Sequence, residues 1–517
     1  MPHLDSLQPV LPPRRSWPLH DAAATRAIEA DALAATPPHA LMARAGHAVA
    51  RLARAIAPRG RSVIALAGPG NNGGDALVAA TALQRLGWQA RAVLLADAAR
   101  LPGDAAWALA QARAAGLPVA DALPATLDAD LLLDGLLGLG ATRAPDGRLA
   151  HAIDRLQDIR GAVLAVDLPS GLHPDRGTPL GAQAVRATHT LALLTLKPGL
   201  FTAAGRDHAG RVWLDDLGVA QPDAMAATMR LAGPPRPIAL AAHASHKGRF
   251  GDVAVVGGAP GMAGAARLAA RAALAAGAGR VFVVALDPAG GVLDDAWPEL
   301  MHRDPEALLT PGRLPALTVA AGCGGGAAIA ARLPPLVARA ARLLLDADAL
   351  NAVAADAALA SALAARGRRG RPTLLTPHPL EAARLLGCTA AEVQADRCVA
   401  ARELAARLHA VVVLKGSGSV VAAPDGRLRI NPSGNALLAS AGTGDVLAGW
   451  AAGRWARAGD KAPDVLELAT EAVFEHGAAA DRAAGTDSVT LAAAGAGSGV
   501  PPSLRATELV EALRRRG

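Results

Sequence analysis

The sequence predicts two doubly wound α/β domains joined by a linker, and three observations indicate this architecture. Short apolar runs typical of buried parallel strands alternate with helical segments along most of the chain. The alternation stops in a proline-rich stretch and then resumes, which marks a domain boundary. The length of 517 residues, of which 52% are hydrophobic, is ample for two packed cores. We expect one domain over 1–231, a linker over 232–245 and a second domain over 246–517.

The first half begins with two predicted helices, over 21–33 and 39–57. A strand over 62–68 then leads into a glycine-rich loop over 68–75 and a helix over 76–87. The remaining elements of this half are a helix over 104–115 and strands over 89–97, 129–140, 162–171 and 188–199. Because strands alternate with helices, we expect a parallel, doubly wound sheet.

The second half repeats the alternation. Its predicted strands lie over 252–258, 280–286, 316–322, 342–350, 373–379 and 410–416. A hairpin over 419–430 turns on a Pro-Asp-Gly sequence at 424–426, residue types that favour tight turns. Helices are predicted near 445–457 and 463–483, and a short helix over 506–517 closes the chain.

Composition argues against several classes of protein. The net charge is +7, but the arginines are scattered and aromatic residues amount to 2%, so we expect no nucleic-acid partner. Cys323, Cys388 and Cys398 form no CxxC pair, which argues against a disulfide scaffold and a cysteine zinc site. There is no run of eighteen apolar residues and no basic-then-apolar leader, so we expect no membrane partner and a cytoplasmic protein.

Lysine is rare in this alanine- and arginine-rich chain. The four lysines are Lys197, Lys247, Lys415 and Lys461. Where lysine is retained despite such a bias, we expect its chemistry to matter more often than at an average position.

The loop after the first predicted strand of the first half fits GxGxxG from Gly68 to Gly73. That pattern, with Asp97 as an acid for a ribose, is compatible with dinucleotide binding. Asp75 argues against a pyrophosphate at this point, because a carboxylate in the first helical turn competes for the same amides. The alternative is a glycine turn with Asp75 as a helix cap.

Three loops at strand ends of the first half carry oxygen ligands. Asn72, Asp134 and Ser170 offer an amide oxygen, a carboxylate and a hydroxyl, which suit a hard cation. Asp167 ends its strand before a Pro-Ser-Gly sequence, so it is a candidate acid or base facing the pocket. The alternative for Asp167 is a loop cap.

The first half resembles the NAD(P)H-hydrate epimerase family over about residues 15–225. NNGGDA, DGLLGLG, VDLPSGLHPDRG and LMARAGHAVA carry the resemblance. It implies a Rossmann-like three-layer sandwich, potassium held by Asn72, Asp134 and Ser170, and contact between Asp167 and the nicotinamide ring. The further residues it places at the substrate site are Asn71, Asn72, Gly73, Gly74, Asp75, Gly138, Leu139, Gly140, Ala141, Thr142, Arg143 and Ala144. The family pattern has Gly at Ala76 and Thr at Leu139, so one substrate-contacting hydroxyl is missing.

Two patterns stand out in the second half. The first is the sequence Gly442-Thr443-Gly444-Asp445, which precedes an apolar helix. The backbone amides and the dipole at the start of such a helix favour an anion. Asp445 is a candidate base for a hydroxyl that attacks phosphorus. A glycine-capped helix is the alternative. Lys415 opens a Gly/Ser loop at a strand end, which suits a nucleotide contact, whereas the alternative is a solvated lysine. No GxxxxGK[ST] run exists, so this is not a P-loop.

The second half resembles the ribokinase-like superfamily, and more closely its ADP-dependent (S)-NAD(P)H-hydrate dehydratases, over about 243–485. HKGRFG, GGAPGMAGAARLA, DADALN, LTPHPLEAARLL and NALLASAGTGDVLAG carry the resemblance. The residues it assigns to the hydrate are Ala265, Gly326, His378 and Asp445. Those it assigns to the nucleotide are Lys415, Gly416, Ser417, Gly418, Ser419 and Gly444. Cys323 stands where the family has Pro, so we expect a looser loop there.

Together the two resemblances imply a bifunctional repair enzyme, both isomerase and lyase, for hydrated NADH and NADPH. The first half would interconvert the R and S hydrates, with Asp167 assisting proton transfer. The second would dehydrate the S form at the expense of ADP, with Asp445 as base. They also imply potassium and magnesium ions and a homo-oligomer. The alternatives are a ribokinase-like small-molecule kinase fused to a dinucleotide-binding domain, and a non-catalytic dinucleotide sensor.

Overall fold

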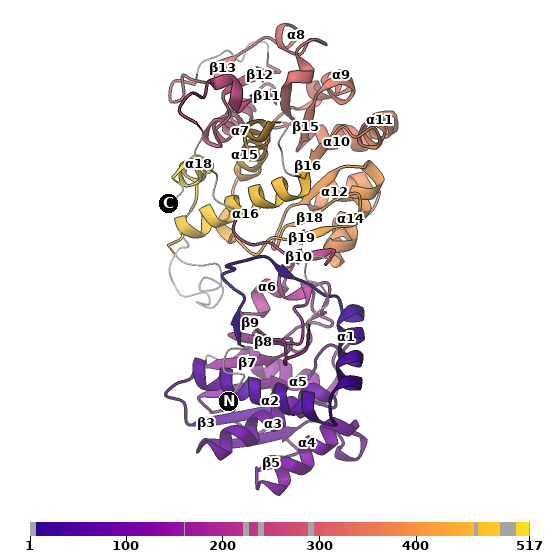
Figure 1. Ribbon diagram of the computed structural model, residues 1–517, viewed down its shortest axis with the longest axis vertical. Coiled ribbons are helices and arrows are strands. Elements are labelled where there is room, and N and C mark those ends of the chain that lie inside the picture. Colours follow the sequence, from indigo (N-terminus) through magenta and orange to yellow (C-terminus); the bar gives the residue numbers. More distant parts are fainter. Residues whose placement is uncertain are drawn as a thin grey trace. The chain divides into compact units, whose positions relative to one another are not determined.

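The computed structural model describes residues 7–159, 161–220, 227–235, 242–287, 294–459, 464–485 and 503–515 (Figure 1). The chain divides into two compact units, Met1–Leu231 and Ala232–Gly517. Part of the predicted linker, residues 236–241, lies outside the described residues.

The first unit is built on one mainly parallel sheet. The sheet has eight strands in the order β1-β9-β8-β7-β6-β3-β4-β5, and only the β1–β9 pair is antiparallel. The strands are β1 (Gln8–Pro9), β3 (Ser62–Ala67), β4 (Gln89–Leu94), β5 (Val119–Ala120), β6 (Leu131–Gly135), β7 (Ala162–Val166), β8 (His189–Leu193) and β9 (Arg211–Asp215). Two further strands, β2 (Trp17–Pro18) and β10 (Met229–Leu231), pair antiparallel and do not belong to this eight-stranded sheet. The helices are α1 (Ala22–Ala35), α2 (Ala40–Ile56), α3 (Asn71–Arg85), α4 (Gly103–Ala114), α5 (Gly147–Gln157) and α6 (Gly205–His208).

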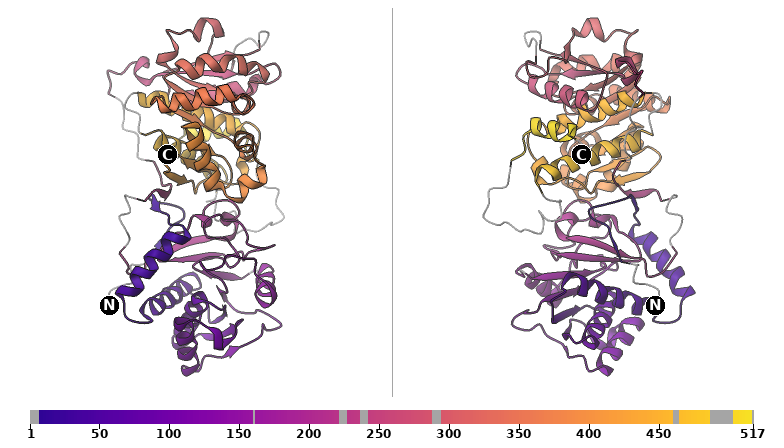
Figure 2. Two further views of the ribbon diagram at one scale, coloured as in Figure 1. Left: turned by 90° about the vertical axis from the view of Figure 1, so that its right-hand side faces the viewer. Right: turned by 60° about the vertical axis from the view of Figure 1, so that its left-hand side comes forward.

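Helices cover both faces of this sheet because alternate strand residues point to opposite sides. Val63 and Ala65 of β3 pack in a core with residues of α2, α3 and α4. Ile64 and Leu66 pack on the opposite side with Ile153 of α5. This three-layer, doubly wound arrangement confirms the α/β fold class predicted for the first half (Figure 2).

The helix after β3 begins earlier than predicted. Because Asn and Gly are poor helix formers, the sequence predicts a loop over 68–75. In the structure, α3 starts at Asn71 with Gly70 as its N-cap. Gly68 and Gly73 explain the start, because a Cβ on Gly73 would lie 2.3 Å from the Gly68 carbonyl oxygen. Only glycine permits this approach of helix to strand end. Asp75 therefore lies in the second helical turn and is not the cap.

Other predicted strands are shorter in the structure because they included their exit loops. β6 ends at Gly135, β7 at Val166 and β8 at Leu193. The sequence reading also missed α5, β5 and β9.

The second unit has its own sheet. The strands run in the order β13-β12-β11-β14-β15-β16-β17-β18-β19, parallel as far as β17. They are β11 (Asp252–Gly257), β12 (Arg280–Ala285), β13 (Met301–His302), β14 (Leu317–Ala321), β15 (Arg342–Leu345), β16 (Thr373–Leu375), β17 (Val411–Leu414), β18 (Val420–Ala422) and β19 (Leu428–Ile430). The helices are α7 (Ala263–Ala275), α8 (Pro305–Leu308), α9 (Leu333–Arg339), α10 (Asp348–Ala355), α11 (Ala357–Arg368), α12 (Pro379–Leu386), α13 (Ala390–Ala395), α14 (Arg397–Leu408), α15 (Thr443–Ala458), α16 (Val465–Ala483) and α18 (Ala506–Arg514).

Helices α7 and α15 pack unusually closely in the core of this unit. Two glycines one turn apart, Gly449 and Gly453, face α7, and a Cβ on Gly449 would lie 1.9 Å from the Ala269 carbonyl oxygen. Small residues therefore permit the close approach of α15 to α7. The predicted hairpin is confirmed, since β18 and β19 pair antiparallel. The predicted strand over 342–350 ends at Leu345, and α10 begins at Asp348.

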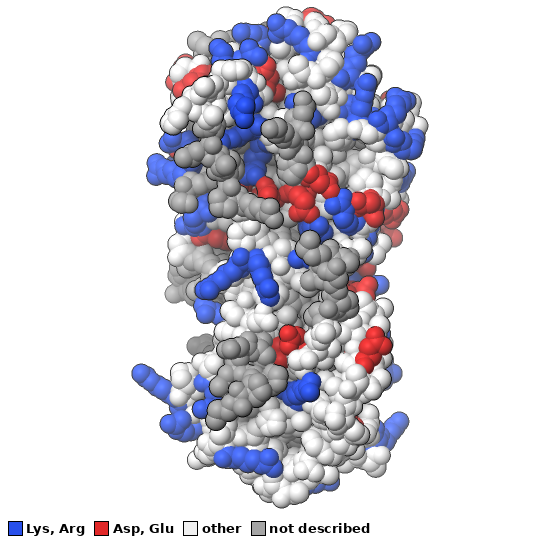
Figure 3. Space-filling view, in the orientation of Figure 1, with Lys and Arg blue, Asp and Glu red and all other residues white. Residues whose placement is uncertain are grey.

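Basic side chains do not form a continuous track on the face drawn in Figure 3, where Lys and Arg are interspersed with neutral and acidic residues. Among the described residues no single helix is long and apolar enough to cross a membrane. Helices α10 and α11 reach the required length and composition only as a pair, bent by 108° at their junction.

Candidate active sites

A cavity of about 610 Å³ lies at the carboxyl ends of the strands in the first unit, where open α/β sheets bind their ligands. It is bordered by the starts of α3 and α5, the loop after β6 and the residues after β7 and β8. The predicted site residues on its wall are Asn71, Asn72, Asp75, Gly138, Leu139, Gly140, Ala141, Thr142, Arg143, Ala144 and Asp167.

Gly73 and Gly74 are not among the residues that border this cavity, and their contact with substrate stays a prediction. Gly73 faces the backbone of Gly68, and a Cβ on Gly74 would lie 2.9 Å from the Met42 sulfur. Both glycines are needed for the packing of α3 against its neighbours. Motif resemblance alone could not separate that role from substrate contact.

Asp167 is held at the cavity wall by a buried lysine. It directly follows β7 with a φ of 65°, a left-handed conformation that Asp tolerates better than most residues. Its Oδ1 accepts hydrogen bonds from the Leu193 N–H, at 3.1 Å, and from the Lys197 ammonium. Lys197 is 1% exposed and also donates to the carbonyls of Leu193, at 2.8 Å, and Thr195, at 3.0 Å. Asp167 is thus tied to the neighbouring strand and is not a cap of its own loop.

Two more carboxyl groups face the same cavity. Burial, together with the charges of Asp167 and Glu29, raises the pKa of Asp75 well above its usual range. Burial and the charge of Asp167 also raise the pKa of Glu29, on α1. A carboxyl that keeps its proton near a lysine-paired carboxylate provides an acid and a base in one site.

The three predicted cation ligands meet around the loop after β6. Asp134, 0% exposed, accepts hydrogen bonds from the Ser170 N–H at 2.8 Å and the Ser170 hydroxyl at 2.5 Å. The Leu137 N–H donates to the Ser170 hydroxyl at 2.8 Å, and the Asn72 amide donates to the Leu137 carbonyl at 3.1 Å. Asp134 and Ser170 lie beneath the cavity rather than on its wall.

Asp134 is a buried acid without a counter-charge in the part of the chain that the structure describes. Burial raises its pKa to about 6, against the opposing effect of the hydrogen bonds from Ser170. A carboxylate, a hydroxyl and a main-chain carbonyl lie together there, which is a donor set that fits a monovalent cation. The residues present therefore fit the potassium ion that the resemblance implies.

In the second unit, acidic and basic groups meet where β15 and β17 end and α15 begins. Lys415 Nζ donates to Asp346 Oδ1 at 2.7 Å, and Thr376 donates to the same oxygen at 2.8 Å. Gly444 adjoins this pair, since a Cβ on it would lie 3.4 Å from Lys415 Nζ. The alternative of a solvated Lys415 is wrong, because its ammonium is paired and mostly buried.

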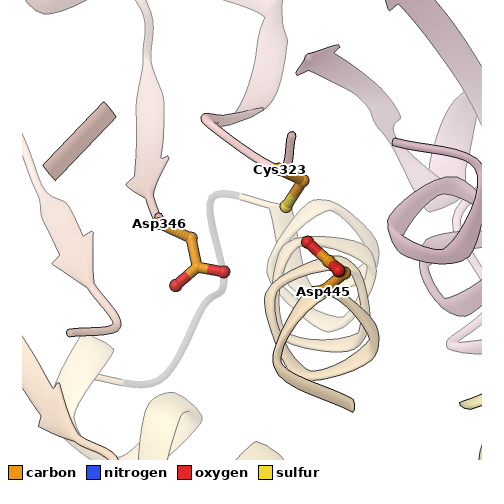
Figure 4. Close-up of side chains that lie close together, drawn as sticks. All are labelled: Cys323, Asp346 and Asp445. Atoms are coloured by element: carbon orange, nitrogen blue, oxygen red, sulfur yellow. The ribbon is translucent and has the colours of Figure 1, made fainter. Parts of the chain in front are cut away.

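Asp445 is the third residue of α15 and faces Asp346 and Cys323 (Figure 4). A carboxyl oxygen of each aspartate and the Cys323 sulfur all lie within 4.8 Å of one another. The N-cap of α15 is Gly442, with a φ of 89°, so Asp445 is not itself the cap. The first amides of the helix and the dipole favour an anion beside Asp445.

The electrostatics of this cluster suit a base that acts near neutral pH. Burial and then the Asp346 charge raise the pKa of Asp445 to about 6, while Cys323 and Lys415 oppose the rise. Burial works to lower the pKa of Lys415, but the charges of Asp346 and Glu381 outweigh it and the pKa is raised. At pH 7 Asp445 is mostly ionised and still a stronger base than an exposed carboxylate.

The predicted nucleotide loop over 416–419 is preorganised. Gly416 has a φ of 142° and lies against the buried guanidinium of Arg397, which a Cβ would approach to 2.8 Å. Arg397 donates to the carbonyls of Leu414 and Lys415 at 3.1 and 3.2 Å. The Ser419 hydroxyl donates to the Gly416 carbonyl at 3.1 Å and closes the loop.

His378 caps a helix. Its Nδ1 accepts hydrogen bonds from the N–H groups of Leu380, at 3.1 Å, and Glu381, at 3.3 Å, at the start of α12. The structure therefore gives this histidine a local role, and its contact with a hydrate stays a prediction.

Ala265 and Gly326 both adjoin the loop after β14. The Gly326 N–H donates to Asp348 Oδ2 at 2.8 Å. A Cβ on Gly324 would lie 3.0 Å from the Ala265 Cβ, so the start of α7 lies directly against this loop. The prediction that Ala265 and Gly326 contact the hydrate is untested.

The looseness expected of the loop at Cys323 is not seen. The Cys323 carbonyl accepts from the Gly258 N–H at 3.1 Å, and the Gly324 carbonyl accepts from the Ala259 N–H at 2.7 Å. Cys323 is 1% exposed. Main-chain hydrogen bonds to the end of β11 hold the loop without the proline.

Three residues of the two sites were not assigned to a site from the sequence. Lys197 and Asp346 are central ion-pair partners, and Glu29 contributes a carboxyl to the cavity. The scarcity of lysine was a signal for Lys197, and the strand-end place of Asp346 was a signal for that residue. Glu29 lies in a segment that the sequence predicts only as a helix, where a charged residue is expected at the surface, so nothing in the sequence indicated a place in the cavity.

Comparison with known families matches both halves of the chain. Residues 38–199 match the family described as YjeF-related protein N-terminus, and residues 253–501 match the family described as NAD(P)H-hydrate dehydratase.

Curated relatives match over most of the chain. The bifunctional NAD(P)H-hydrate repair enzyme Nnr of Escherichia coli is 36% identical over 93% of this chain and 92% of its own length. The Nnr enzyme of Moorella thermoacetica is 36% identical over 82% of this chain and 83% of its own length. A solved ADP/ATP-dependent NAD(P)H-hydrate dehydratase from Bacillus subtilis is 29% identical, covers 54% of this chain and 92% of its own, and has a TM-score of 0.42.

Proposed function

This chain belongs to the family of bifunctional NAD(P)H-hydrate repair enzymes, and from that premise we propose which unit and which residues carry each reaction. The enzyme epimerises the R and S hydrates of NADH and NADPH and dehydrates the S form at the expense of ADP. The assignment depends on one observation. Each unit has an aspartate at a lysine ion pair at the carboxyl end of its own sheet: Asp167 is paired with Lys197 in the first, and Asp445 lies next to the pair of Lys415 and Asp346 in the second.

We assign epimerisation to the first unit, with the nicotinamide ring in the cavity of about 610 Å³. The hydrate carries a hydroxyl on C6, next to the ring nitrogen. Inversion at this carbon requires proton transfer to and from that hydroxyl as the C–O bond breaks and re-forms. Asp167, oriented by Lys197, moves the proton, and Asp75 supplies one because its carboxyl is held protonated.

We assign a potassium ion to the site formed by Asn72, Asp134 and Ser170, with the Leu137 carbonyl beside them. Bound there, such an ion would supply the positive charge that buried Asp134 lacks, next to the loop over 136–140 on the cavity wall. Asp134 and Ser170 hold this loop from below, while Asn72 anchors it to α3.

We assign dehydration to the second unit. Asp445 removes the proton from the C6 hydroxyl as its oxygen attacks the β-phosphorus of ADP, and AMP leaves. Phosphate then departs from C6 with the C–O electron pair, driven by the ring nitrogen, and loss of a proton from C5 restores the double bond. Lys415, the loop over 416–419 and Gly444 hold the nucleotide phosphates at the start of α15.

Magnesium is proposed as a companion of the nucleotide phosphates, whose oxygens it prefers. No side chain is assigned to it. A homo-oligomer and a cytoplasmic location also stay predictions.

The deciding experiment mixes the purified protein with a defined mixture of R and S NADPH hydrates and ADP. Recovery of absorbance at 340 nm reports dehydration, and chromatography of the two hydrates without ADP reports epimerisation. A stable phosphorylated product would instead indicate a kinase. Tight binding without turnover would indicate a sensor.

A further inference from the structure

Helix α1 brings one further carboxyl group, that of Glu29, to the cavity of the first unit. The residues of α1 on the cavity wall are Thr25, Arg26, Glu29 and Leu33. Residues three and four positions apart lie on one face of a helix, so this face of α1 forms a wall of the cavity. The side chain of Glu29 is half-buried and makes no hydrogen bond or ion pair with any residue that the structure describes. Its carboxyl group is therefore available to a molecule bound in the cavity.

A hydrogen bond fixes this face of α1 to the segment that holds Asp167. The hydroxyl oxygens of Thr25 and Thr195 lie 2.8 Å apart, and both side chains are buried. The Thr195 carbonyl in turn accepts a hydrogen bond from the Lys197 ammonium, which is paired with Asp167. Glu29 lies about one turn after Thr25, so Glu29 and Asp167 border one cavity from two different elements, α1 and the end of β7.

The charges around Glu29 suit a group that holds a proton and can release it. Burial, and then the charge of Asp167, raises the pKa of Glu29. Lys197 and Arg26 oppose this rise, and Asp104 on α4 adds to it. A carboxyl group that keeps its proton longer than an exposed one, near the lysine-paired carboxylate of Asp167, provides a donor and an acceptor on separate walls.

Inversion at C6 of the hydrate requires proton transfer on both faces of the ring. As the C–O bond breaks, the hydroxyl takes a proton and leaves as water with the electron pair of that bond, and the ring nitrogen forms a double bond to C6. When water adds to the opposite face, a new C–O bond forms and the water loses a proton. Asp167 is fixed at the end of β7 by Lys197, so it serves one face of a ring that stays in place. A second group on another wall is needed for the other face.

We propose that Glu29 is a second catalytic residue of epimerisation, which transfers the proton on the ring face turned away from Asp167. In one direction Glu29 protonates the leaving hydroxyl, and Asp167 accepts the proton of the entering water. In the other direction the two carboxyl groups exchange these roles. One carboxyl gains the proton that the other loses, so no co-reactant is consumed. The inference rests on the proposed function of the first unit.

The test follows inversion of each NADPH hydrate in water labelled with ¹⁸O, without ADP, together with uptake of the label into the C6 hydroxyl. Glu29→Gln keeps the size of the side chain but removes the group that transfers the proton. We expect it to slow interconversion of R and S by about 10²–10⁴-fold, the usual effect of losing an acid or base. One epimer should still take up ¹⁸O without inverting, because Asp75 and Asp167 remain to serve its face, and the other epimer should not. Asp167→Asn should show the opposite preference between the two epimers.

Asp31→Asn is the matched control, because Asp31 is an exposed carboxylate on the same helix and does not border the cavity. It should leave inversion and label uptake at their wild-type rates. Thermal unfolding followed by circular dichroism checks that Glu29→Gln is folded. If glutamine is not tolerated there, Glu29→Asp replaces it, because the shorter carboxyl should slow inversion while ¹⁸O uptake on the face of Asp167 continues.

Inversion by Glu29→Gln at the wild-type rate would overturn the proposal. Loss of ¹⁸O uptake by both epimers in the folded variant would also overturn it, because Glu29 would then not serve one face alone. A wild type that does not interconvert the hydrates, or does so without taking up ¹⁸O, would instead refute the proposed function of the first unit, before any variant is compared.

Discussion

The ammonium group of Lys415 lies 2.7 Å from a carboxylate oxygen of Asp346, at the point where two parallel strands of the second unit end. The pair neutralises one of the two aspartates that face each other across the start of α15. The remaining carboxylate, Asp445, is the proposed base, and the same lysine borders Gly444, where the nucleotide phosphates are proposed to bind.

Lys415→Met should weaken the binding of ADP and also slow dehydration. Methionine keeps most of the length of the side chain but removes the charge, and a charge-assisted hydrogen bond to phosphate contributes about 1.5–3 kcal/mol. We expect the Kd for ADP to rise about tenfold or more by calorimetry. Unchanged ADP affinity would show that Lys415 only pairs with Asp346.

Asp445→Asn should stop dehydration while ADP still binds. The change preserves shape but removes the base, which typically slows a reaction by about 10²–10⁴-fold. Calorimetry should give an ADP affinity close to wild type, because the amides at the start of α15 remain. Epimerisation should continue at the wild-type rate. Loss of both activities and of ADP binding would indicate a damaged fold instead.

The wild-type rate of dehydration should fall on the acid side of about pH 6. Burial raises the pKa of Asp445 to about 6, and the base works only when ionised, so kcat/KM rises with pH through that value and then levels. Steady-state rates between pH 5 and pH 8 measure this limb. A profile that is flat across this range would exclude Asp445 as the titrating base.

The features of the fold that the sequence predicted best are the buried strands and the motifs at their carboxyl ends. The apolar runs at β3, β11 and β17 are continuous, as expected for parallel strands buried on both faces. The loop predicted over 68–75 is wrong from Asn71 onward, where the chain is helical, because tertiary packing through Gly73 overrides the weak helix propensity of this segment.

Ion-pair partners were also beyond the sequence. Lys197 lies thirty positions from Asp167, and Asp346 lies 69 positions from Lys415. Only the strand order of the folded sheets brings each pair together. A pattern of residue types can suggest that a charged group matters, but not which group it contacts.

Potassium should stabilise the protein through the first unit. The buried Asp134 carboxylate has no basic partner among the described residues, so an ion bound there should raise the unfolding temperature in potassium relative to lithium at equal ionic strength. Asp134→Ala should abolish this difference and the potassium response of epimerisation, while dehydration persists. Equal unfolding temperatures of the wild type in both salts would contradict the site.

The ion pair between Asp167 and Lys197 should govern both epimerisation and the stability of the first unit, and a double-mutant cycle tests this. Asn at 167 tolerates the positive φ of 65° but leaves the Lys197 ammonium buried without its carboxylate. Lys197→Met leaves the opposite charge unpaired, and breaking a buried pair from either side costs about 3–5 kcal/mol. The double variant Asp167→Asn, Lys197→Met removes both charges of the pair, so its loss of unfolding free energy should be smaller than the sum of the two single losses.

Denaturant unfolding of the first unit measures the loss of unfolding free energy in each of the three variants. All three variants should lose epimerisation and keep dehydration of the S hydrate. Strictly additive losses would show that the two groups do not stabilise each other, and retained epimerisation in Asp167→Asn would remove Asp167 from the proton transfer.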